Sequence, residues 1–253
     1  MAINEVFPNP TVKQVIFQIR FPNLFYIENK IGDFQIKIMK QFPKSGILYK
    51  RQLVFADIGL GAKPEKIAED LKDAVALKIW NFSTEKNVEL NIMANSLDIS
   101  SNYHKTYNLE GGEKFRTIIE FVISNFIEIV NIPIIQRLGL RYIDECPIPE
   151  KQNEVFASYY NSVFPIERFN LNDATEMDFK TIVKRGNCYL RYIESLLKIG
   201  ESYKLILDFD GFAENVAIED YLKVTDHLHD IISNEYERTI KDPVIRFMKE
   251  TKE

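Results

Sequence analysis

The chain is poor in cysteine and histidine, and this scarcity argues against several kinds of site. Its 253 residues contain two cysteines, Cys146 and Cys188, which form no CxxC or Cys/His pattern. Isolated cysteines of this kind predict reduced thiols in a cytosolic protein, and a disulfide between the two is the other option. Of the three histidines, His227 and His229 are two positions apart and would point to different sides of a helix. We therefore expect no metal site, and no motif implies a cofactor.

Long apolar runs and an excess of basic residues are also missing. No segment reaches the roughly 18 apolar residues that span a bilayer, and no basic region followed by an apolar run begins the chain. We therefore expect a cytoplasmic protein without membrane contact. Lys and Arg number 32 against 37 Asp and Glu, which gives a formal net charge of -5. This balance argues against duplex DNA binding driven by charge alone, because that mode needs many cations near the phosphates.

Catalytic and nucleotide-binding signatures are missing too. The sequence has no GxSxG and no GxGxxG, so it predicts neither a nucleophile elbow nor a dinucleotide-binding loop.

What the sequence does contain is a recurring order of apolar patterns. Alternating apolar and polar residues predict half-buried strands, and spacings of three and four predict amphipathic helices. The clearest helix, at 115–130, has an apolar face that needs a broad partner such as a sheet. The predicted strands are 12–20, 47–55, 75–82, 88–93, 97–100, 137–144, 176–183, 188–195 and 203–209, and the predicted helices are 27–42, 65–71, 115–130, 154–163 and 219–238.

These patterns predict an α+β fold with a single domain over residues 1–253. The expected core is an extended antiparallel sheet with long helices packed on one face. Residues 1–133 and 134–253 would form two pseudo-repeats, each in the order strand, helix, strands, helix. This order resembles the helix-grip units of the TATA-binding-protein fold, in which two units share one curved sheet. The resemblance implies that helices cover the convex side and that strands 12–20 and 137–144 are neighbours at the centre.

The strand 137–144 carries the first candidate site. Its period of two sends the two leucines and the tyrosine to the core and Arg137, Gly139 and Arg141 to the opposite face. Guanidinium and amide groups on neighbouring strands suit a phosphate or a carboxylate, because the arginine fork binds such oxyanions bidentately. The alternative is a solvated sheet face with exposed or salt-bridged arginines. The predicted binding residues are Gln14, Gln18, Arg20, Arg137, Arg141 and Arg191.

A second candidate lies on the strand that begins near residue 176. Glu176, Asp178 and Lys180 fall on one face of this strand and resemble the Asp/Glu-x-Lys element of metal-dependent nucleases. In such enzymes the carboxylates hold Mg²⁺ and the lysine positions or polarises the attacking water. Any strand with one solvated face produces the same pattern. The segment 208–211, Asp-Phe-Asp-Gly, resembles the start of a calcium loop without its later ligands, and we expect a turn there.

Several stretches together resemble a bacterial protein family that is sporadically distributed and has no established activity. They are Phe7 to Pro10, Val12 to Phe21, Ile31 to Phe34, Leu97 to Tyr107 and, most specifically, Arg137 to Asp144. The family often has a tryptophan shortly after the tyrosine that corresponds to Tyr107, whereas the one tryptophan here is Trp80. The resemblance implies a single-domain family with the patchy distribution of mobile or defence-associated genes.

We expect a non-enzymatic binding or adaptor protein, in a bacterial defence or mobile-element setting, that presents its sheet to a partner. That partner would be a protein, an anionic ligand or single-stranded nucleic acid. The alternative is a metal-dependent enzyme that processes nucleic acids or nucleotides with Glu176, Asp178 and Lys180. A third option is a structural subunit of an oligomer, in which another chain covers the sheet.

Overall fold

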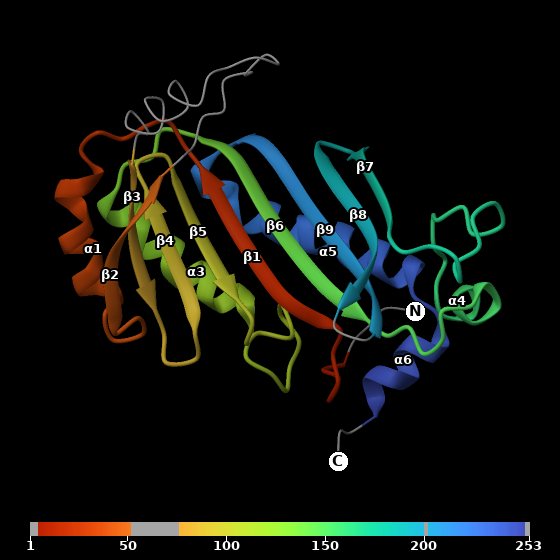
Figure 1. Ribbon diagram of the computed structural model, residues 1–253. Coiled ribbons are helices and arrows are strands. Elements are labelled where there is room, and N and C mark those ends of the chain that lie inside the picture. Colours follow the sequence, from red (N-terminus) through yellow and green to blue (C-terminus); the bar gives the residue numbers. More distant parts are fainter. Residues whose placement is uncertain (1–4, 52–75, 200–201, 251–253) are drawn as a thin grey trace, which may run out of the picture.

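Nine strands form one antiparallel sheet in residues 5–51, 76–199 and 202–250, which are the residues that the computed structural model describes (Figure 1). The predicted α+β class and antiparallel sheet are confirmed. In spatial order the strands are β2 (Lys44–Arg51), β3 (Ala76–Ser83), β4 (Val88–Met93), β5 (Ser96–Ser101), β1 (Val12–Arg20), β6 (Ile135–Cys146), β9 (Ser202–Val216), β8 (Cys188–Ile199) and β7 (Met177–Arg185).

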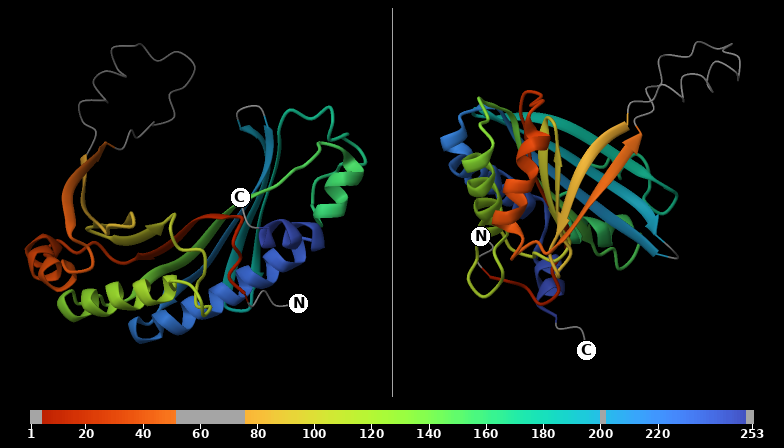
Figure 2. Two further views of the ribbon diagram at one scale, coloured as in Figure 1. Left: turned by 90° about the horizontal axis from the view of Figure 1, so that it is seen from below. Right: turned by 90° about the vertical axis from the view of Figure 1, so that its left-hand side faces the viewer.

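The two longest described helices lie along the convex side of this curved sheet, and no described helix covers its concave side (Figure 2). No described helix is both long and apolar enough to cross a membrane. The helices are α1 (Ile31–Ile38), α3 (Phe115–Ile129), α4 (Asn153–Tyr159), α5 (Tyr221–Thr239) and α6 (Asp242–Lys249), with short 3-10 turns η1 (Ile27–Lys30) and η2 (Ile218–Asp220).

The core fills the space between the sheet and the helices. Leu138 and Leu140 of β6 are fully buried there, as the alternation predicts. From α3, Phe126 packs edge-on against Phe34 of α1, with ring centroids 5.4 Å apart. Gly211 of β9 lies directly beneath α5, because a Cβ at this position would be 3.3 Å from Cδ1 of Ile232. Aromatic and aliphatic burial on this face explains why the helices stay on one side of the sheet.

The strands β1 and β6 pair at the centre, as predicted. Their antiparallel register places Gln18 opposite Gly139 and Arg20 opposite Arg137. Side chains of paired residues point to the same face of a sheet. The pairing therefore brings polar residues from the N-terminal part and from the middle of the chain together on the concave side.

Some predicted elements differ from the structure. The turn predicted at 208–211 is wrong, because β9 continues through it to Val216. The aspartates of that segment stay in the strand because arginines of the neighbouring strands pair with them. The helix predicted at 154–163 ends at Tyr159, and the one predicted at 27–42 begins as the 3-10 turn η1. The predicted helix 65–71 and the end of the predicted strand 47–55 lie outside the described residues. Cys146 and Cys188 are buried, free thiols.

Candidate functional site

A row of residues, each paired with the next across neighbouring strands, crosses the whole concave face at the level of Gly139. On the β2 side it is polar: Asn81 Nδ2 donates to Asn91 Oδ1 at 2.8 Å, and Gln18 Nε2 donates to Asp98 Oδ1 at 2.5 Å. On the β7 side it is aromatic, since two rings stack with centroids 5.1 Å apart. From β2 to β7 the row consists of Gly46, Asn81, Asn91, Asp98, Gln18, Gly139, Phe212, Tyr189 and Lys184.

Arg137 lies across the middle of this row. A Cβ at Gly139 would be 2.6 Å from Nη1 of Arg137, so the guanidinium occupies the space that the glycine leaves. From there Nη2 of Arg137 donates to both carboxylate oxygens of Asp210 at 3.0 Å. The same guanidinium lies 4.7 Å from the ring centroid of Phe212 and contacts Gln18 Oε1 at 3.3 Å. The absence of a side chain at Gly139 thus allows Arg137 to reach a carboxylate on β9.

Two further arginines are held in the same way. Arg141 donates from Nε and Nη2 to the two oxygens of Asp208, at 2.7 and 2.6 Å. Arg191 of β8 contacts Asp210 from the other side at 3.0 Å. The side chains of Asp208 and Asp210 are only 8% and 9% exposed. Hydrogen bonding to Asp208 raises the pKa of Arg141, so this guanidinium stays charged.

Five of the six predicted binding residues line one groove of about 390 Å³ on the concave face. The sixth, Gln14, lies opposite Ile143 on the same face and outside the groove. The arginines converge on this groove, and three of them are ion-paired, as the alternative of a salt-bridged sheet face allows. A binding role for this face stays a prediction. Arg20 is exposed and donates from Nε to Gln18 Oε1 at 2.8 Å. The groove is lined by Ile16, Gln18, Arg20, Arg137, Gly139, Arg141, Ile182, Arg191, Asp210 and Phe212.

Sequence reasoning missed Asp208 and Asp210, which hold the arginines. Acidic residues two positions apart, with apolar residues at the alternate positions, are the signal that could have found them. The aspartate and glycine content of the segment instead favoured a turn.

The second predicted site is less well assembled. Asp178 and Lys180 lie in β7 opposite Ser195 and Ile193, whereas Glu176 precedes the strand. All three predicted residues are exposed. Among the described residues, no group of three or more His, Cys, Asp or Glu side chains could hold a metal ion. The catalytic role of these residues stays a prediction.

We expect Gly139→Val to lower the free energy of unfolding by about 1–3 kcal/mol, because the new side chain must displace Arg137 from Asp210. Urea denaturation measures this change. Gly46→Val is the matched control, since Gly46 belongs to the same row and has nothing within 4 Å of its Cβ position. Equal losses in the two variants would contradict the role assigned to Gly139.

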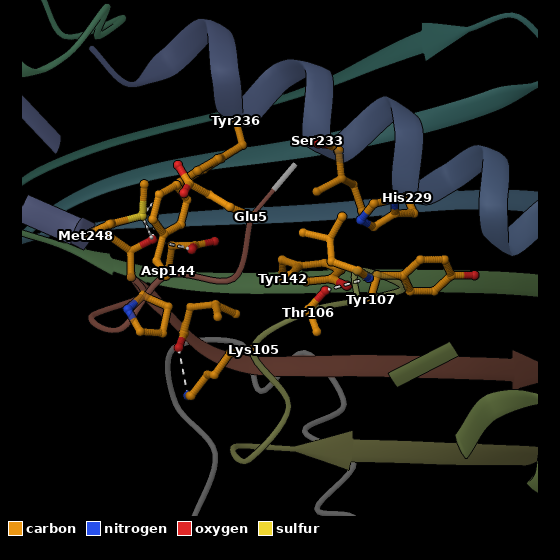
Figure 3. A pocket seen from close by; sticks show the side chains of 16 residues that line it. Glu5, Lys105, Thr106, Tyr107, Tyr142, Asp144, His229, Ser233, Tyr236 and Met248 are labelled. Atoms are coloured by element: carbon orange, nitrogen blue, oxygen red, sulfur yellow. Dashed lines mark hydrogen bonds between the residues drawn. The ribbon is translucent and has the colours of Figure 1, made fainter. Parts of the chain in front are cut away.

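A pocket of about 140 Å³ lies on the other face of β6, among the N-terminal segment, the loop before α3, α5 and α6 (Figure 3). Asp144, which is 5% exposed, accepts a hydrogen bond from Thr11 Oγ1 at 2.8 Å. The Thr11 hydroxyl also shares a 2.6 Å hydrogen bond with Tyr236 Oη. Burial raises the pKa of Asp144 to about 7, from an ordinary value of 3.8. Asp144 lies four positions after Leu140 and therefore on the same, core-facing side of the strand. An acidic residue at a core-facing position is the sequence signal that could have found this pocket.

His229 of α5 contributes the opposite end of this pocket (Figure 3). Its imidazole stacks on Tyr107 with ring centroids 4.3 Å apart. Tyr107 Oη in turn donates to Asp226 Oδ1 at 2.6 Å, and Arg116 Nε donates to the same atom at 2.8 Å. Burial lowers the pKa of His229, which favours the neutral ring. The neighbouring His227 is exposed.

No family model matches the chain, and searches of curated proteins and of solved structures find no significant match.

Proposed function

We propose that this chain is a binding protein whose concave sheet face receives an anionic group of a ligand or partner protein. The observation that carries the proposal is the convergence of Arg20, Arg137, Arg141 and Arg191 on one groove. Guanidinium groups recognise carboxylates and phosphates through directed pairs of N–H donors.

The ion pairs within the groove support this role. Asp208 and Asp210 hold three guanidinium groups in place before a ligand arrives. Groups that are already ordered lose less conformational entropy on binding. The lining of the groove holds four arginines and one carboxylate, Asp210, whereas Asp208, Glu214 and Asp98 lie on the same face outside this lining.

Arg20 is the arginine best placed to meet an incoming anion. Among the described residues it forms no ion pair, and the side-chain hydrogen bond that it donates, to Gln18, uses Nε. Its two terminal nitrogens therefore retain donors for a ligand.

The row through Gly139 supports an extended ligand that lies across the strands. Side-chain amides on one half of the row can donate and accept hydrogen bonds, and Phe212 and Tyr189 on the other half offer aromatic surface. A peptide segment with acidic residues can contact both halves of the row. A short single-stranded nucleic acid can do the same, with its bases stacked on the aromatic half.

We also propose that the sheet is an internal duplication. The strand order outward from β1 is β5, β4, β3 and β2, and outward from β6 it is β9, β8 and β7, so the first half has one outer strand more. β1 lies next to β5, which precedes the long helix α3, and β6 lies next to β9, which precedes the long helix α5. This similarity supports two repeats that meet at the β1–β6 pair.

Arg20→Ala tests the groove without disturbing a buried ion pair. We expect the affinity for acetate, inorganic phosphate or an oligothymidylate, whichever binds the native protein, to fall about five- to tenfold. Titration calorimetry measures the affinity, and thermal melting should change little because Arg20 is exposed.

Arg238→Ala is the control, since Arg238 is an exposed arginine on α5. Equal affinities in native protein and Arg20→Ala, or no binding of any of the three probes at millimolar concentration, would contradict the proposal. DNA or RNA cleavage that requires Mg²⁺ or Mn²⁺ and is lost in Asp178→Asn would instead support the enzymatic alternative.

A further inference from the structure

The pocket on the helix side of β6 is separate from the groove. Alternate residues of a strand point to opposite faces, so Arg141 lies on the concave side and Asp144 on the side of the helices. The volume of about 140 Å³ suits a small molecule, because an apolar cavity of about 150 Å³ in another protein binds benzene.

Asp144 is the charged group that most needs a partner in this pocket. Its carboxyl group receives one hydrogen bond, from Thr11 to Oδ1, and forms no ion pair with any described residue. Lys105 also lines the pocket and its charge acts on Asp144 from a distance, but its ammonium group donates to the backbone carbonyls of Val12 and Asn102, each at 2.9 Å. A buried carboxylate without a cation in direct contact is unfavourable, so a ligand that supplies one would gain affinity.

Aromatic rings surround the remaining space. The rings of Phe7, Tyr107, Tyr142 and Tyr236 all line the pocket. The faces of such rings attract cations, and the attraction strengthens where water is excluded. The hydroxyl of Tyr142 is buried and has no hydrogen-bond partner in the described part of the chain.

The other charged groups at the pocket do not reverse its preference for a cation over an anion. Glu5, at the edge of the pocket, pairs with Lys249 at 2.7 Å. Partial burial lowers the pKa of His229 and favours its neutral form. An anion would have to enter beside Asp144, whereas a cation would neutralise it. Apolar side chains that could contact the body of a ligand are Val12, Leu109, Ile232 and Met248.

We propose that this pocket is a binding site for a small organic amine, with its ammonium group at Asp144 and its apolar body among the aromatic rings. In Figure 3, Asp144, Tyr236 and Met248 lie at one end of the pocket and Tyr107 and His229 at the other, which leaves room for a ligand with a polar and an apolar end. This site does not depend on the function proposed for the groove.

Three probes that share one ring test the ligand class on the full chain at pH 8. Benzylamine is cationic, benzyl alcohol is neutral and benzoate is anionic. We expect saturable binding of benzylamine that is at least about tenfold tighter than that of benzyl alcohol, and no binding of benzoate in this pocket. Titration calorimetry gives the affinities, and shifts of the Tyr142 and His229 NMR signals locate the ligand.

Asp144→Asn should weaken benzylamine about tenfold and leave benzyl alcohol within about twofold, because the amide keeps the shape but not the charge. Asp33→Asn makes the same chemical change at an exposed position on α1 and should alter neither affinity. Tyr142→Leu should weaken benzylamine several-fold and Tyr142→Phe should restore it, which tests the ring if Asp144→Asn does not fold. Equal binding of benzylamine and benzyl alcohol, unchanged benzylamine affinity in a folded Asp144→Asn, or no saturable binding of benzylamine would overturn the proposal.

Discussion

Replacing Asp210 with alanine is expected to lower the free energy of unfolding by about 3 kcal/mol, one of the two largest effects that the structure predicts. Asp210 is the shared partner of Arg137 and Arg191, so its loss leaves two guanidinium groups without their carboxylate. The side chains of these arginines are only 22% and 29% exposed, so water compensates little. Their partial exposure places the expected cost at the lower end of the range for broken buried pairs.

Urea denaturation of Asp210→Ala and of Asp178→Ala measures this effect against a matched control. Asp178 is an exposed aspartate on strand β7, opposite Ser195, and its replacement should change the free energy of unfolding by less than about 0.5 kcal/mol. Similar changes in the two variants would mean that the arginine cluster contributes nothing to folding. A selective loss in Asp210→Ala would show that the groove is held by ion pairs that also support the fold.

Replacing Asp144 with asparagine is expected to stabilise the protein by up to about 4 kcal/mol at pH 8, and to have little effect near pH 4. Burial raises the pKa of Asp144 in the folded chain to about 7, whereas 3.8 is its ordinary value. Below pH 4 the carboxyl is protonated in both states and contributes no difference. As the pH rises toward 7, ionisation favours the unfolded chain, and above 7 the folded chain must bury a carboxylate.

The measurement is the free energy of unfolding of both proteins from pH 4 to pH 8. The difference between Asp144→Asn and the native protein isolates this residue from other buried acids such as Glu194, whose pKa burial also raises. Asp33→Asn, at an exposed position, should show no such trend. A difference that is constant with pH, or largest near pH 4, would show that Asp144 does not titrate as its surroundings indicate.

The strand β6 connects the two proposed sites because its side chains alternate between the faces of the sheet. Arg137 and Arg141 point into the groove, and Asp144 points into the pocket beneath α5 and α6. Variants of Arg20 and of Asp144 should therefore separate the two sites. Loss of anion binding with intact amine binding, or the reverse, would distinguish the failure of one proposal from the failure of the other.

Local sequence patterns were sufficient for part of this structure. The alternation in residues 12–20 and 137–144 predicted which side chains face the core, because a strand has a period of two whatever its neighbours are. The two leucines of β6 are buried and its arginines face the groove, as predicted. The apolar stripe of 115–130 likewise predicted α3, since a helix with that stripe must cover a sheet or another helix.

Local patterns failed where a residue depends on a partner that is distant in the chain. Residues 208–211 have the composition of a turn, yet they form part of β9 because Arg137, Arg141 and Arg191 pair with the two aspartates there. The alternation placed Gly139 between two arginines on one face, but only the structure shows that Arg137 crosses to Asp210 through the space that the missing side chain leaves.

The sequence by itself therefore determined the fold class, the faces of the central strands and most of the residues around the groove. Only the tertiary structure decided that carboxylates hold the arginines, and that Asp144, Tyr142 and His229 share a pocket beneath α5. The physical reason is that periodicity depends on the backbone geometry of neighbouring residues, whereas ion pairs and pockets depend on register and packing between separate segments, which for Arg137 and Arg141 and their aspartates are more than 60 residues apart.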